Sequence, residues 1–117
     1  MELEMNLAIL QFSKIVFGKK TIESRLYDKK RQQLQVGDIV VFTERDHPEN
    51  KVRVRITDLL RHKTFKELFE NQPVELFGGD NVDSLLHEIG AFYSSEDELQ
   101  YGVVGIQFEL VGRSEKE

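Results

Sequence analysis

The stretch Gly18-Lys19-Lys20-Thr21-Ile22-Glu23-Ser24-Arg25 marks the junction between a predicted helix and a predicted strand. Apolar residues recur at helical spacing just before it, and its first residue, a glycine, stands where glycines commonly end helices. In a strand from residue 20 to residue 26, alternation directs Ile22 to one face and Glu23 and Arg25 to the other. The α-carbons of these two charged residues are then about 7 Å apart, with the ammonium of Lys20 at the edge. Such a surface can bind an anion or a base, or can form an internal ion pair.

The remaining sequence predicts strands with helices inserted between them. Apolar runs and period-two alternation predict strands at residues 2–7, 20–26, 39–43, 51–56 and 102–110. Helical spacing and capping residues predict helices at residues 9–16, from Thr64 to residue 70, from Asp80 or Asn81 to Phe92, and from Ser94 or Ser95 to Leu99. Turn-forming residues predict a hairpin at residues 46–50. This order favours an α+β domain built on a curled β-sheet or small β-barrel with inserted and flanking helices.

Length and composition describe one ordinary domain. A chain of 117 residues can bury a core without a metal or a disulfide, and we place the domain at residues 1–112, followed by a charged tail at residues 113–117. The absence of cysteine excludes disulfides, thiol catalysis and thiolate metal sites. The three histidines show no metal-ligand spacing, and there is no phosphate-binding loop, dinucleotide fingerprint or nucleophile-elbow serine. We therefore expect no metal and no cofactor.

Hydropathy and the first residues predict where the protein resides. No apolar run approaches the roughly 20 residues of a membrane span. The start Met1-Glu2-Leu3-Glu4 is acidic, unlike that of a signal peptide. We therefore expect an intracellular, cytoplasmic protein with no membrane partner.

Charge is unevenly distributed along the sequence. The chain has a net charge of −5, yet residues 14–31 carry seven basic and two acidic residues, a local net charge of +5. Residues 64–101 carry nine acidic residues and one lysine, a local net charge of −8. Both regions can be solvated faces, but the first can also be an anion-binding patch, and the second can contact another protein.

The spacing G-x-K-x-x-E-x-R, formed by Gly18, Lys20, Glu23 and Arg25, resembles the hallmark of the ASCH domain family. The resemblance continues through residues 34–38, 65–69, 92–96 and 101–106 in the same order, and so covers nearly the whole chain. It implies a PUA-like β-barrel. Barrels of that kind bind RNA or a single modified base in a cleft beside the barrel, so the resemblance implies RNA or nucleotide binding.

An enzymatic alternative also follows from the resemblance. Some small members of the family hydrolyse the acetyl amide of N4-acetylcytidine with a lysine, a threonine and a glutamate, and others are associated with ribonuclease activity. Alignment on the glycine places that lysine at Lys20, whereas the threonine is replaced by Glu23. Glu75 and Glu88 are both candidates for the remaining glutamate. A metal-independent hydrolase acting on a modified nucleoside or on RNA therefore remains open.

The candidate ligand-binding residues are Lys20, Glu23, Arg25 and Tyr93, and the first two are also the candidate catalytic residues. A desolvated lysine can act as a base, and a charged one can attract a phosphate. A carboxylate can accept a hydrogen bond from the amino group of a base. An arginine can bind a phosphate or the edge of a base, and a tyrosine can stack on a base. Each residue also has a structural interpretation, as an ion-pair partner or a core aromatic. The basic face of residues 51–55 can likewise guide a phosphate backbone or remain a solvated face.

Overall fold

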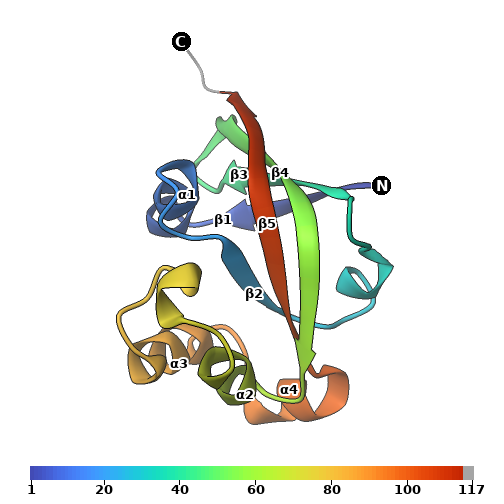
Figure 1. The fold of residues 1–117 in the computed structure, drawn as a ribbon, viewed down its shortest axis with the longest axis vertical. Coiled ribbons are helices and arrows are strands. Elements are labelled where there is room, and N and C mark those ends of the chain that lie inside the picture. The colour runs from blue at the N-terminus through green and yellow to red at the C-terminus, as the bar shows by residue number, and fades with distance from the viewer. Residues whose placement is uncertain (115–117) are drawn as a thin grey trace.

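One curled five-stranded sheet forms the body of the molecule (Figure 1). The structure, a computed structural model, describes residues 1–114 and gives residues 113 and 114 as backbone alone. The strands are β1 Glu2–Leu7, β2 Ile22–Leu26, β3 Ile39–Glu44, β4 His47–His62 and β5 Val103–Ser114. Their order is β1-β3-β4-β5-β2; β1 pairs with β3 in parallel, and every other pair is antiparallel. The predicted α+β fold on a curled sheet is confirmed.

The α-helices lie in two places along the chain. The helix α1 Ile9–Val16 connects β1 to β2, and a 3₁₀ turn at Arg31–Gln33 follows β2. All the others lie between β4 and β5, namely α2 Phe65–Glu70, the 3₁₀ helix η2 Val74–Phe77, α3 Val82–Gly90 and α4 Ser95–Tyr101. This second group gathers at one end of the sheet, at the bottom of Figure 1.

Side-chain caps explain where three of these helices begin. Thr64 accepts a hydrogen bond from the backbone of Glu67 at the start of α2. Asn81 and Ser94 each form a capping box, at the start of α3 and of α4 respectively. Each cap satisfies amide groups that the first helical turn leaves without partners. Of the alternatives left open by the sequence, Asn81 and Ser94 are therefore the caps.

Two apolar cores lie on opposite faces of the strands β2 and β5. One core fills the inside of the curl and includes Phe42, Val104 and Ile106. The other lies between the sheet and the second group of helices and includes Ile22 and Leu68. The register places Glu23 opposite Ile106, and residues paired in this way point to the same face. Glu23 therefore points toward the inside of the curl and, as the alternation predicted, lies on the face opposite Ile22.

Several elements differ from the expected boundaries. The turn between β3 and β4 occupies only residues 45 and 46, and β4 already begins at His47. Pro48 is tolerated because it lies in an irregular part of the ladder, where no pairing bond requires its missing amide hydrogen. Phe92 lies beyond the end of α3 and is exposed. β5 extends to Ser114, past residue 110, where the closing strand was expected to end, and residues 115–117 of the expected tail lie outside the described residues.

The contact between α2 and the sheet should be sensitive to truncation of Leu68, which is fully buried. A β-carbon at Gly105 on β5 would lie 2.9 Å from a methyl group of Leu68, so the two are closely packed. We expect Leu68→Ala to lower the free energy of unfolding by about 2–5 kcal/mol, because it removes buried methyl groups and leaves a cavity. Leu99→Ala, at an 89% exposed position, should change it by less than about 0.5 kcal/mol. Urea denaturation measures both, and equal effects would contradict this packing.

Candidate functional site

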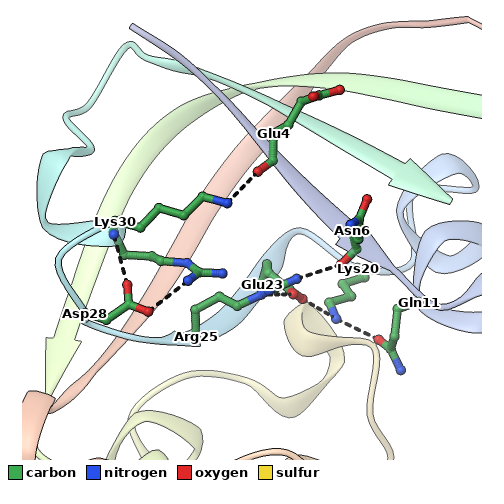
Figure 2. A network of polar contacts seen from close by, with 9 residues as sticks. Glu4, Asn6, Gln11, Lys20, Glu23, Arg25, Asp28 and Lys30 are labelled. Atoms are coloured by element: carbon green, nitrogen blue, oxygen red, sulfur yellow. Dashed lines mark hydrogen bonds and ion pairs between the residues drawn. The ribbon is translucent and has the colours of Figure 1, made fainter. Parts of the chain in front are cut away.

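The sheet is open between its two outer strands, β1 and β2, and basic side chains bridge this gap (Figure 2). Nη2 of Arg25 donates to the carbonyl oxygen of Asn6 at 3.0 Å. Nζ of Lys30 donates to the carbonyl oxygen of Glu4 at 3.1 Å. Both acceptors belong to β1 and would otherwise remain open on the edge of a sheet. Side chains from the region after α1 therefore connect strands that no backbone ladder joins.

A buried ion cluster lies beside this gap. Glu23 accepts from Nζ of Lys20 at Oε1 and from Nε of Arg25 at Oε2, each at 2.7 Å. Lys20 also donates to Oε1 of Gln11, on α1, at 2.6 Å. The side chains of Lys20, Glu23 and Arg25 are only 8%, 7% and 15% exposed. The structure thus brings together three of the four residues singled out from the sequence, as one chain of ion pairs (Figure 2).

The cluster stabilises the charged forms of its members. Burial by itself raises the pKa of the Glu23 carboxyl, but the charges and hydrogen bonds of Lys20 and Arg25 outweigh burial, so the pKa lies below its ordinary value of 4.5. Burial lowers the pKa of the Arg25 guanidinium, but the charge of Glu23, together with the side chain of Tyr93, raises it above its ordinary value. Glu23 is therefore a carboxylate at neutral pH.

A cleft of about 410 Å³ opens over this cluster, within the size range of sites for small organic ligands. Its base is polar and buried, because Lys20 and Glu23 are less than 10% exposed. Its exposed mouth includes two apolar side chains, Leu10 from α1 and Phe92 from the segment after α3. The remaining lining residues are Asn6, Leu7, Ala8, Gln11, Ser24, Arg25, Arg45, Phe69, Phe77, Leu85, Glu88, Ile89 and Tyr93.

Tyr93, the fourth predicted ligand-binding residue, lines the same cleft. Its ring stacks on Phe65, with the ring centroids 5.6 Å apart and the planes 18° apart. The second core therefore covers one face of the tyrosine ring. Tyr93 also interacts with Arg25, so it holds the ion cluster from the helical side.

The two glutamates left open by the sequence lie in different places. Glu88 lines the cleft that contains the ion cluster. Glu75 lines a second cleft, of about 450 Å³, together with Lys14, Lys19 and Thr21. Of the two, Glu88 is therefore the one that shares a cleft with Lys20. Within residues 1–114, no three histidine, aspartate or glutamate side chains form a group that could hold a metal ion.

The basic face of β4 is paired with acidic residues. Lys51 contacts Glu4 at 3.0 Å and Arg53 contacts Glu2 at 2.7 Å. Arg55 contacts Glu109 at 3.3 Å. These exposed ion pairs neutralise the face that the sequence suggested as a guide for phosphates. They favour its interpretation as a solvated surface.

Sequence reasoning missed Gln11, Asn6, Arg45 and Phe92. Gln11 looks like an ordinary polar residue of an amphipathic helix, and Asn6 contributes its backbone carbonyl, which any residue could supply. Phe92 was assigned to the apolar stripe of α3. In the structure α3 ends at Gly90, and the ring of Phe92 is exposed.

Comparisons with known proteins agree with this architecture. A hypothetical protein designated PH0355 is 34% identical, with a TM-score of 0.84 over 95% of this chain and 100% of that chain. Protein PF0455 from Pyrococcus furiosus is 33% identical, with a TM-score of 0.74 over 95% of this chain and 98% of that one. A mutant ASCH protein from Zymomonas mobilis is 12% identical, with a TM-score of 0.59 over 95% and 73% of the two chains, and shares the fold. No curated protein matches the sequence significantly.

The open, curled five-stranded sheet with inserted helices is a PUA-like fold, and the charged motif lies beside its opening. The family model of the ASCH domain matches residues 9–112 of the sequence, so this chain belongs to the ASCH domain family. The family is associated in general with RNA binding. Among the described residues, no helix has the length and apolar character needed to cross a membrane.

Replacing the central carboxylate should destabilise the fold in a pH-dependent way. We expect Glu23→Gln to lower the free energy of unfolding at pH 7 by about 3–5 kcal/mol, because two buried cations lose their counter-ion. The pKa of Glu23 is lower in the folded than in the unfolded chain. Ionised Glu23 therefore contributes fully to the free energy of unfolding above about pH 4.5, and this contribution is lost as the pH falls through the pKa of the folded state. The difference between variant and wild type should therefore shrink below pH 4.5.

Urea denaturation over a series of pH values measures this difference. Glu70→Gln provides the control, because Glu70 is exposed on α2 and has no ion-pair partner among the described residues. A Glu23→Gln effect that stays constant from pH 7 to pH 3 would contradict the ionised cluster.

Proposed function

We propose that the cleft binds a single base or nucleotide of RNA. The observation that carries the proposal is the buried cluster of Lys20, Glu23 and Arg25 at the base of a cleft with exposed apolar side chains at its mouth. Flat heteroaromatic ligands need such a combination, because their edges form hydrogen bonds and their faces require apolar contact.

The cluster retains hydrogen-bonding capacity for a ligand. Lys20 has three donor hydrogens, of which Gln11 and Glu23 accept two. Arg25 has five, and its bonds to Glu23, Asn6 and Tyr93 use three. Each carboxylate oxygen of Glu23 has a further lone pair. The base of the cleft therefore offers both donors and an acceptor at fixed positions, as recognition of a base edge requires.

The charge states favour binding over proton transfer by Glu23. A general base works best when its pKa is near the working pH. The pKa of Glu23 lies below 4.5, and both of its oxygens already accept hydrogen bonds from cations. Glu23 is therefore better suited to orienting Lys20 and Arg25 than to accepting a proton.

Single-stranded RNA should bind through the cleft. We expect a random-sequence RNA octamer to bind at low ionic strength, with affinity that falls as salt rises. Lys20→Ala and Arg25→Ala should each weaken binding by about tenfold or more, because a charge-assisted hydrogen bond is lost. Fluorescence anisotropy of labelled RNA measures the affinity, and thermal unfolding verifies that each variant folds.

Lys66→Ala and Arg55→Ala are the matched controls, since both residues are exposed and lie outside the cleft. Their effects should be smaller than those of the cleft variants at the same salt concentration. If the RNA pool does not bind at low salt, or if all four variants weaken it equally, the cleft is not the RNA site.

A hydrolase is the second candidate, and the position of Glu88 is the observation that favours it. Glu88 lies in the same cleft as Lys20, so a general base and an ammonium group could act on one amide. Incubation with N4-acetylcytidine, followed by chromatography, should then release cytidine. Glu88→Gln should slow the reaction by about 10²-fold or more, whereas Glu75→Gln, in the second cleft, should not. Absence of cytidine with the wild-type protein would rule out this activity.

A further inference from the structure

Arg45 differs from the other arginines of the described side chains. It lies in the turn between β3 and β4, and its backbone amide donates to the carbonyl oxygen of Leu7 at 2.8 Å, which holds the turn against the end of β1. Its side chain is exposed and lines the cleft. Each of the other arginines from residue 1 to residue 112 contacts a carboxylate or, for Arg61, the ring of Tyr27. Within that range, Arg45 alone has neither kind of partner.

The lining of the cleft has a net positive charge, and Arg45 is its cation without an ion-pair partner among the described residues. The lining residues include three cations, Lys20, Arg25 and Arg45, and two anions, Glu23 and Glu88, which leaves a net charge of +1. Glu23 contacts both of the inner cations. The outer guanidinium is thus the group best able to bind an anion without breaking an existing ion pair. A planar guanidinium matches the oxygens of a phosphate in a two-point contact.

Phe92 supplies an aromatic ring at the same mouth. Its backbone amide donates to the carbonyl oxygen of Ile89 at 3.0 Å, which fixes the residue just beyond α3. The side chain is 65% exposed and lines the cleft. Unlike Tyr93, whose ring is stacked on Phe65, Phe92 has no aromatic neighbour among the described residues. A base that stacks on Phe92 would cover this exposed apolar surface.

We propose that the ligand of this cleft is a nucleotide rather than a free nucleoside, with its phosphate bound by Arg45 and its base stacked on Phe92. The inference rests on the proposed function, since it assumes that a base enters the cleft. It adds the chemical class of the ligand and two residues outside the family motif. The ion cluster then forms hydrogen bonds with the edge of the base, while Arg45 binds the phosphate and Phe92 stacks on the base at the mouth of the cleft.

The phosphate requirement can be tested with the four 5′-nucleoside monophosphates and their parent nucleosides. We expect NMR titration of the wild-type protein to show at least one nucleotide binding about tenfold more tightly than its nucleoside. Arg45→Gln should abolish that preference. Arg55→Gln makes the same change of charge outside the cleft and should preserve it.

The stacking contact can be followed by fluorescence, because the chain has no tryptophan. Phe92→Trp places a single indole at the mouth of the cleft, and the bound nucleotide should quench its emission. Ribose 5-phosphate, which has no base, should not quench it. Phe17→Trp is the control, since Phe17 is 74% exposed and does not line the cleft.

The outcomes separate this inference from the proposed function. Equal binding of nucleotides and nucleosides, or equal effects of Arg45→Gln and Arg55→Gln, would overturn the phosphate contact and leave base binding intact. Equal quenching at positions 92 and 17 would overturn the stacking contact. If neither nucleotides nor nucleosides bind, the proposed function fails, and this inference fails with it.

Discussion

The carboxylate of Glu23 can remain ionised inside the curl of the sheet because Lys20 and Arg25 each contact it at 2.7 Å. An isolated buried carboxylate would cost several kcal/mol or would take up a proton. The two cations are in turn held by Gln11 on α1 and by the carbonyl of Asn6 on β1. One ionised group thus determines how three elements of the structure meet.

The same network explains why the cleft lies where it does. A closed barrel would pair β1 with β2 and leave no room for a ligand, whereas a fully open sheet would expose the edge of β1 to other strands. Here the side chains of Arg25 and Lys30 satisfy carbonyl groups of β1 across the gap. The sheet therefore remains open without a long unprotected edge, and the opening becomes the base of a ligand-sized cavity.

Local patterns in the sequence were sufficient for the fold and for the centre of the site. Alternation through Ile22, Glu23 and Arg25 predicted which side chains share a face, and capping residues predicted the starts of the helices. The mouth of the cleft was not predictable in this way. Arg45 and Phe92 line the same cleft although they are 47 positions apart, and their exposure depends on how a turn and a helix end pack against the sheet. Such tertiary placement leaves no periodic signal in the sequence.

The pairing of β2 with β5 also has a consequence for folding. It joins residues 22–26 to residues 103–107, and three α-helices lie between β4 and β5. Domains rich in such distant pairings fold slowly, in about milliseconds to seconds, because a long loop must close before its contacts stabilise anything. Glu23 and Arg25 therefore leave the ribosome early but reach their final positions late. Until β5 docks, a nascent chain contains every charged residue of the motif, but β2 lacks the backbone ladder that holds Glu23 and Arg25 in place.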